Sequence, residues 1–368
     1  MVMFSIFSRL YNVKYVLISV SLVTLYIWYY FQSTTTGIST NTDLATHHVT
    51  EPIRVHYFNK PKGINGSRFE ICKHRCYLTH GMSSYRTSHV VIFHGPTLGS
   101  FVTSPPMKYP RQIWILHGKE SPVNYVGSLK SWKRVFNWTM TYRRDSDIAA
   151  LNGIFATESG YVDSVNRSSL FQSKMKNIAW FVSNCHTHGG REKYVDTLRD
   201  LMDVTVYGKC GKQKCPRSKD KKCMEILRGY FKFYLSFENS LCHDYITEKG
   251  FKVYRYNSYV IPVTRGLTGT QYQMYLPQSS YINTEDFRSV PKLVTRLLSI
   301  AENETLYNTY FEWENRYTAD LYTPQDFCQL CERLHNEDRY RSLYDDISHW
   351  WTNEPYRNVC RSKHDVEL

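Results

Sequence analysis

A cluster of acids, amides and a lysine follows an apolar stretch in the segment FYLSFENSLCHDYITEKGF, residues 233–251. Within it, Glu248 and Lys249 are adjacent and are expected about one turn inside a helix. A carboxylate can accept two hydrogen bonds from the vicinal hydroxyls of a ribose, and a lysine ammonium neutralises a phosphate as a point charge. The pair is therefore suited to holding a nucleoside diphosphate. The alternative interpretation is a capped surface helix that carries an incidental Glu-Lys pair.

The flanking elements predict where this cluster lies. Apolar residues alternate from Phe233 to Phe237, which predicts a β-strand, and a helix is expected to begin near His243 or Asp244. In open α/β sheets, ligands bind beyond the carboxyl ends of the strands, where the free N–H groups and dipoles of helix N-termini attract anions. The polar residues that would lie at that edge are Glu238, Asn239 and Ser240.

Two series of alternating strands and helices extend over the rest of the chain. In the first, apolar runs predict strands at residues 53–58, 89–95 and 111–118. In the second, strands are predicted at residues 177–184, 203–208, 233–237 and 259–266, with a helix at 191–202. This alternation predicts two α/β halves with parallel sheets, joined near residues 165–175, and a Trp- and Tyr-rich final segment that is expected to be helical.

Charge and hydropathy indicate the compartment. The chain has 46 Lys and Arg against 33 Asp and Glu, a net charge of +13, which fits nucleic acid, an anionic membrane or a phosphate-bearing ligand. Residues 15–31 are almost wholly apolar and follow Arg9 and Lys14, which predicts a transmembrane signal-anchor with residues 1–14 in the cytosol. A cleaved signal peptide is the alternative. The polar residues 32–50 are expected to form a stem. Such a single-pass type II topology argues against nucleic acid as a partner.

Sequons and cysteines agree with a lumenal, oxidising compartment. Asn-x-Ser/Thr sequons occur at Asn65, Asn137, Asn166 and Asn303. The ten cysteines are expected to be mostly paired. Two close pairs stand far apart in the chain, Cys72 with Cys76 and Cys328 with Cys331. The second of these also resembles a redox or zinc pair, but we expect two bridges between the pairs, which would hold the C-terminal part of the chain to the first half.

A basic segment, GKCGKQKCPRSKDKKC, occupies residues 208–223 and holds seven Lys or Arg with three cysteines. Cys210, Cys215 and Cys223 lack the spacing of a zinc ribbon, and lumenal thiols tend to oxidise. We therefore expect a solvated loop tethered by disulfides in preference to a zinc site.

The string FYLSFENSLCHDYITEK as a whole resembles the signature of the α-1,3-fucosyltransferases, in which a strand ends in F-E-N-S and D-Y-[IV]-T-E-K follows. Other blocks resemble this family in the same order, namely CYLTHGMSSYRTSHVVIFHG, ESPVNYVGSLKSWKRVFNWTMTYRRDSDI, AWFVSNCHTHGGREKY, IPVTRG and YFEW. The resemblance covers residues 69–351. It implies a GT-B architecture of two Rossmann-like domains, at residues 51–172 and 173–345, with the active site between them and residues 346–368 as a tail packed on the first domain.

The resemblance also implies an activity, which is transfer of L-fucose with inversion from GDP-β-L-fucose to the 3-hydroxyl of N-acetylglucosamine in glycoprotein or glycolipid glycans. It implies a Golgi membrane enzyme with a lumenal catalytic domain. Inversion needs a base that takes the proton of the acceptor hydroxyl. The matching residue is Glu120 in GKESP, which follows the strand at 111–118; apart from the resemblance, an exposed loop glutamate would be the simpler interpretation.

The donor-binding residues that the resemblance implies are Ser183, Arg191, Tyr234, Asn239, Tyr245, Glu248 and Lys249. Arg191 and Lys249 would stabilise the negative charge that grows on the departing diphosphate. The segment RRDSDI contains a D-x-D pattern, which binds metal in other glycosyltransferases. We interpret Arg143, Arg144, Asp145 and Asp147 as a structural ion-pair cluster instead and predict no obligatory metal or other cofactor.

Departures from the family pattern leave the acceptor open. The chain reads YRYNSYVIPVTRG and LNGIFATES where the family has other residues, and Gly250 follows the lysine. Lewis-type lactosamine, LacdiNAc and the N-glycan core all remain candidate acceptors. Two alternative functions remain. One is an inverting transferase that uses another sugar nucleotide, and the other is a catalytically silent, membrane-tethered glycan-binding protein.

Overall fold

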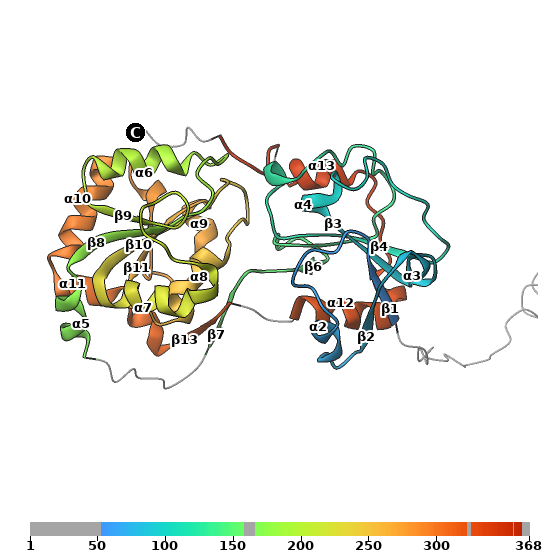
Figure 1. Ribbon diagram of the computed structural model, residues 1–368, viewed down its shortest axis with the longest axis horizontal. Helices are drawn as coiled ribbons and strands as arrows, with labels where there is room; N and C mark the ends of the chain where they lie inside the picture. The colour runs from blue at the N-terminus through green and yellow to red at the C-terminus, as the bar shows by residue number, and fades with distance from the viewer. Residues whose placement is uncertain (1–52, 158–165, 322–324, 356, 363–368) are drawn as a thin grey trace, which may run out of the picture. The chain divides into compact units, whose positions relative to one another are not determined.

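A computed structural model describes residues 53–157, 166–321, 325–355 and 357–362. The predicted cytosolic tail, signal-anchor and stem, residues 1–50, lie outside the described residues. Within the described part of the chain, no helix is long and apolar enough to cross a membrane. The strands of this part form two parallel sheets and one antiparallel ribbon (Figure 1).

The first sheet has six parallel strands in the order β2-β1-β3-β4-β5-β6. These are β1 (Ile53–Tyr57), β2 (Cys76–Thr79), β3 (Val90–His94), β4 (Ile113–Gly118), β5 (Trp138–Thr141) and β6 (Ile148–Ala149). The helices near them are α2 (Ser67–Glu70), α3 (Met82–Thr87) and α4 (Gly95–Leu98). The predicted strands correspond to β1, β3 and β4, whose apolar runs reflect burial on both faces.

The second sheet has five parallel strands in the order β12-β11-β10-β8-β9. These are β8 (Lys176–Phe181), β9 (Val204–Tyr207), β10 (Phe231–Phe237), β11 (Ile261–Arg265) and β12 (Ile282–Asn283). One face packs against α6 (Arg191–Arg199), α10 (Val290–Ala301) and α11 (Glu304–Thr309). The other packs against α7 (Asp220–Tyr230), α8 (Glu248–Arg255) and α9 (Gly269–Tyr272) (Figure 1).

The alternation that predicted β10 divides its side chains between the two faces of this sheet. Phe233, Leu235 and Phe237 pack with α6 and α10, whereas Tyr234 packs with α7 and α8. The predicted strands and the helix at 191–202 are all present in this half, so the expectation of parallel α/β sheets is confirmed.

The chain passes between the halves at two places. β7 (Ile154–Thr157) and β13 (Tyr317–Asp320) pair as an antiparallel ribbon. After β7, α5 (Arg167–Ser173) already packs on the second core through Leu170 and Phe171. The second half therefore begins before the boundary expected after residue 172.

After β13 the chain returns to the first sheet. α12 (Gln325–His335) buries Phe327 and Leu330 in the core that contains β1 and β3. α13 (Ile347–Thr352) buries Trp350 and Trp351 in a core with residues of β3 and β4. The return thus starts at α12, earlier than the boundary expected at residue 345. Among the described residues of this end, the helical elements are α12, α13 and the short turn η5 (Glu337–Tyr340).

Two disulfides fasten α12 to the first half. Cys72 is bonded to Cys328 and Cys76 to Cys331, which are bridges between the two distant cysteine pairs. Because each cysteine of CQLC has a partner far upstream, this motif is neither a redox pair nor a zinc site.

Candidate active site

The polar turn after β10 is a loop. The prediction that a helix begins near His243 or Asp244 is wrong, because α8 begins at Glu248 with Thr247 as its N-cap residue. Glu248 and Lys249 are therefore the first two residues of α8 instead of lying one turn inside it. They remain at a helix N-terminus, where the dipole favours an anion.

Two features keep this loop from becoming helical. Asp244 has a left-handed backbone, with φ of 60°, which an α-helix of L-residues excludes. Cys242 is bonded to Cys360, and the His243 N–H donates to the Val359 carbonyl at 2.8 Å. The loop is therefore held by a segment distant in sequence, which local helix signals do not report.

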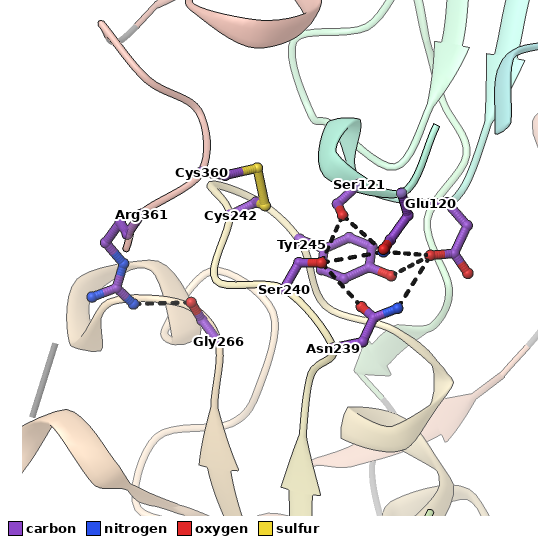
Figure 2. The surroundings of a disulfide bond; sticks show 10 residues. Glu120, Ser121, Asn239, Ser240, Cys242, Tyr245, Gly266, Cys360 and Arg361 are labelled. Carbon is purple, nitrogen blue, oxygen red and sulfur yellow. Dashed lines mark hydrogen bonds between the residues drawn. A yellow bond between two sulfur atoms is a disulfide. The ribbon is translucent and has the colours of Figure 1, made fainter. Parts of the chain in front are cut away.

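Glu120 follows β4 and is held through one carboxylate oxygen. Its Oε2 accepts from the Tyr245 hydroxyl at 2.9 Å and from the Asn239 amide at 3.4 Å (Figure 2). The Asn124 amide also donates to Oε2, at 3.2 Å. Among the described residues, no hydrogen bond reaches the other oxygen, Oε1. A carboxylate oriented by one oxygen and open at the other is suited to remove a proton from a bound hydroxyl.

The groups that hold Glu120 come from both halves of the protein. Asn124 lies in the short turn η1 (Pro122–Asn124) after β4, whereas the other two donors lie in the loop after β10. Beside them, the Ser121 hydroxyl donates to the Ser240 hydroxyl at 2.8 Å, and both side chains are fully buried (Figure 2). The carboxyl ends of β4 and β10 therefore meet at this glutamate.

Two buried tyrosines in the cluster stay protonated. Burial, followed by the charge of Glu120, raises the pKa of Tyr245 well above its ordinary value. The phenol is therefore a hydrogen-bond donor at physiological pH. Tyr234 on β10 is also buried, and burial, followed by the charges of Glu248 and Glu238, raises its pKa.

Glu238 is a buried carboxylate that fixes the start of α8. It accepts from the Thr247 N–H at 2.7 Å and from the Thr247 hydroxyl at 2.8 Å. Lys249 completes the network, since its ammonium donates to the Thr247 hydroxyl at 2.7 Å and lies 3.4 Å from Glu238. Burial raises the pKa of Glu238, although the charge of Lys249 opposes this. Buried acids are usually paired, and this one positions a lysine.

Lys249 is a fixed cation at the N-terminus of α8. Burial favours its neutral form, but the carboxylates of Glu238 and Glu248 outweigh burial and raise the pKa of Lys249. Glu248 lies 3.8 Å from the ammonium and is 41% exposed, so a ligand can reach its carboxylate. The arrangement provides a positive charge and an accessible acceptor side by side.

Arg191 begins α6 and is almost fully buried. Its guanidinium donates to the Phe237 carbonyl at 2.7 Å and to the Asn184 carbonyl at 3.1 Å. It therefore joins the segments that follow β10 and β8. Its charge acts on Lys249, which places both cations at the same edge of the sheet. Ser183, after β8, is exposed, and no hydrogen bond among the described residues connects it to this cluster.

The segment RRDSDI does not form one ion-pair cluster. Arg143 pairs with Asp145 at 2.5 Å, whereas the backbone N–H of Arg144 donates to Asp244 in the loop after β10 at 3.0 Å. Asp147 accepts from a backbone N–H and a hydroxyl of β5, and its ion pair is with Arg333 of α12, at 3.7 Å. In the ranges that the structure describes, no group of three or more His, Cys, Asp or Glu could hold a metal ion.

Three further disulfides are Cys185–Cys210, Cys215–Cys223 and Cys242–Cys360. They pair all three cysteines of the basic segment, so it holds no cysteine for zinc. The segment is a disulfide-tethered loop only up to the short turn η2 (Arg217–Lys219), and its last residues form the first turn of α7. An oxidising compartment indicates that these cysteines are disulfide-bonded, but the spacing of Cys185 and Cys360 in the sequence does not reveal their partners.

The sequon asparagines differ in their surroundings. Three are exposed, namely Asn65, Asn166 and Asn303. The fourth, Asn137, is partly buried, and its Oδ1 accepts from the Lys108 ammonium at 2.6 Å and the Trp114 N–H at 3.0 Å. Its Nδ2, the atom that would carry a glycan, donates to the Ser342 carbonyl at 3.0 Å.

Some residues of the site were not predicted from the sequence. Asn124 contacts the proposed base, and its only signal is its position four residues after Glu120. Thr247 contacts Lys249 and was not predicted. Glu238 was predicted to lie at this edge of the sheet, but its role in holding Lys249 through Thr247 was not. Contacts of this kind depend on the tertiary fold, so sequence spacing alone does not identify them.

Two solved structures are similar in fold to this chain. One is described as "Crystal Structure of alpha1,3-Fucosyltransferase with GDP-fucose", with a TM-score of 0.50 and 16% identity over 79% of this chain and 93% of that chain. The other is described as the same enzyme type "with GDP", with a TM-score of 0.53 and 15% identity over 78% and 92% of the two chains. The fold of the chain is therefore GT-B-like, with Rossmann-like parallel sheets.

Family models and relatives place the chain more closely. The model "Fucosyltransferase, N-terminal" matches residues 44–153, and "Glycosyltransferase family 10 (fucosyltransferase) C-term" matches residues 171–350. The Drosophila melanogaster "Glycoprotein 3-alpha-L-fucosyltransferase A" is 34% identical over 78% of this chain and 56% of its own length. The rat "4-galactosyl-N-acetylglucosaminide 3-alpha-L-fucosyltransferase 9" is 32% identical over 76% of this chain and 75% of its own length. The chain belongs to glycosyltransferase family 10, a family of fucose-transferring enzymes.

Proposed function

We propose that the protein transfers L-fucose with inversion from GDP-β-L-fucose to the 3-hydroxyl of N-acetylglucosamine in glycoprotein or glycolipid glycans. The observation that best supports this proposal is the state of Glu120, whose Oε2 is fixed by three donors while Oε1 is open. Membership of the family supports fucose as the transferred sugar. The names of the two relatives, which specify 3-alpha-L-fucosyl transfer, support the linkage.

In this proposal the donor binds at the carboxyl edge of the second sheet. Glu248 accepts hydrogen bonds from the ribose hydroxyls, and Lys249 neutralises the diphosphate. Arg191 contributes mainly through its charge, because two of its nitrogens already donate to backbone carbonyls. The remaining donor-binding residues of the proposal are Ser183, Tyr234, Asn239 and Tyr245.

The proposed reaction is a displacement at the anomeric carbon of fucose. Oε1 of Glu120 takes the proton of the acceptor 3-hydroxyl. At the same time the oxygen of this hydroxyl forms a bond to the anomeric carbon, on the face opposite the diphosphate. The bond between the anomeric carbon and the diphosphate oxygen breaks, and GDP leaves with the electron pair. Lys249 and Arg191 stabilise the charge that develops on this leaving group, so the proposal needs no metal ion.

We place this activity in the Golgi lumen, on a single-pass type II membrane protein. The apolar segment at residues 15–31, the sequons and the five disulfides support this placement. The predicted anchor belongs to the part of the chain outside the described residues.

The test is a transfer assay with the full chain. GDP-fucose, GDP-mannose and UDP-sugars are offered with lactosamine, LacdiNAc and N-glycan core acceptors, and the linkage of each product is determined. We expect α-1,3-linked fucose from GDP-fucose alone, including in excess chelator. If the protein transferred sugar from another nucleotide donor and none from GDP-fucose, the proposed donor would be refuted. Glycan binding without any transfer would indicate a silent binding protein, and complete loss of activity in chelator would refute metal independence.

A further inference from the structure

The basic loop, residues 208–223, is joined at its beginning to the proposed donor site. Cys210 is bonded to Cys185. The neighbouring residue, Asn184, accepts a hydrogen bond from Arg191 at 3.1 Å through its carbonyl. The first part of the loop is therefore linked, through a disulfide and one peptide unit, to a cation of the proposed diphosphate site.

The other end of the basic loop forms the first turn of α7, which is held beside α8. Asp220 pairs with Lys252 of α8 at 2.7 Å, and α8 begins with the proposed ribose acceptor Glu248. A disulfide between Cys215 and Cys223 closes the part of the loop between these attachments. The basic loop thus extends along the carboxyl edge of the second sheet, from the Arg191 side of the site to the α8 side.

The basic loop carries a large excess of positive charge. It holds seven Lys or Arg against one acid, Asp220, which is already paired with Lys252. Six of its cations are exposed lysines, namely Lys209, Lys212, Lys214, Lys219, Lys221 and Lys222. None of these lysines forms an ion pair within the described part of the chain. A tethered loop of this charge produces a fixed positive potential next to the site.

We propose that the basic loop attracts the anionic nucleotide donor and retards loss of its nucleoside diphosphate product. This inference rests on the proposed function, since it assigns a nucleoside diphosphate to the neighbouring site. Charge of one sign along a binding edge concentrates ligands of the opposite sign and raises association rates by about 10 to 10³-fold at low salt. The loop acts at a distance through its potential, in contrast to the direct contact proposed for Lys249.

The experiment compares two triple variants of the full chain. The loop variant carries Lys209→Gln, Lys212→Gln and Lys214→Gln. The matched control carries Lys62→Gln, Lys73→Gln and Lys176→Gln, which remove the same charge from exposed lysines outside the loop. KM for GDP-fucose, kcat and the Kd for GDP are measured for each protein at low and at high salt.

For the loop variant we expect KM and the GDP Kd to rise about fivefold to tenfold in about 50 mM NaCl, with kcat not reduced. The difference should shrink below about twofold in about 500 mM NaCl, since the Debye length then falls well below 10 Å. The control variant should resemble the wild type at both salt concentrations.

Equal KM and Kd values for the two variants at low salt would overturn the inference, as would a difference that salt does not reduce. An unchanged GDP Kd with weaker binding to vesicles containing phosphatidylserine would assign the loop to a membrane surface and would also overturn it. Failure of the proposed function is a separate result, in which the wild type transfers no fucose; the GDP Kd still tests the loop in that case.

Discussion

Replacing Glu120 with glutamine removes the capacity to accept a proton while preserving the shape of the side chain. In the native site three donors face Oε2, so the amide oxygen of Glu120→Gln should occupy this position. The NH₂ group then takes the place of Oε1. An amide nitrogen donates hydrogen bonds and cannot serve as a base at neutral pH, so the acceptor hydroxyl keeps its proton.

The size of the effect follows from this geometry. A positioned general base contributes about 10²–10⁴-fold to a rate, so kcat should fall by about this factor. At about 1.36 kcal/mol per tenfold, the loss corresponds to about 2.7–5.4 kcal/mol of transition-state stabilisation. The residues that hold the start of α8 are Glu238 and Thr247, which the variant retains. The Kd for GDP should therefore change by less than about twofold.

The assay measures kcat with saturating GDP-fucose and acceptor, and titration calorimetry measures GDP binding. Glu225→Gln, the same change at an exposed position on α7, is the control and should behave as the wild type. A Glu120→Gln enzyme that retains a third or more of the wild-type kcat would refute the assignment of the base. Loss of GDP binding together with activity would instead indicate that the variant disrupts the fold.

Further predictions concern the site, stability and glycosylation. Tyr245→Phe removes the shortest hydrogen bond to Glu120 and should lower kcat about tenfold, since such a bond to a charged group contributes about 1.5 kcal/mol; an unchanged kcat would contradict the role of the phenol in holding Glu120. Lys249→Met should raise KM for GDP-fucose and lower kcat together, and unchanged kinetics would contradict its role. Burial lowers the pKa of Lys174 from 10.5 to about 6. At a pH between these two values, the unfolded chain therefore binds one more proton than the folded chain. The free energy of unfolding should therefore rise with pH over this interval in urea titrations, and Lys174→Met should remove the rise. Glycopeptide mapping should find Asn137 unmodified, because a glycan on its Nδ2 would displace the native hydrogen bond; full occupancy would contradict this.

The sequence predicted the sheets well where strands are central and long. β3, β4, β10 and β11 are continuous or alternating apolar runs, and burial on both faces produces these patterns. The strands that were not predicted are short, with two to four residues each, namely β2, β5, β6, β7, β12 and β13. Of the strands of this length, β9 was predicted, since Val204, Val206 and Tyr207 supply an apolar pattern. The return of α12 to the first sheet was likewise placed too late, since its amphipathic pattern does not state which sheet it covers.

The residues of the site were also predicted only in part. Glu120 and Lys249 were found because family motifs surround them. The start of α8 was misplaced because local helix signals were weighed without the disulfide between Cys242 and Cys360, which constrains the loop from a distance. Asn124 was missed because its contact with Glu120 depends on the short turn η1, for which the sequence shows no periodic pattern.

The disulfides that cross the protein have a consequence for its biosynthesis. Cys72 and Cys76 are 256 and 255 residues before their partners on α12, so the ribosome makes the entire second half before either bridge can form. Until then, the first sheet lacks the side chains that α12 supplies to its core, and its thiols are open to wrong partners. Newly made chains should therefore depend on oxidative folding catalysts after translation ends, and the yield of folded protein should be most sensitive to a pulse of reductant during that interval.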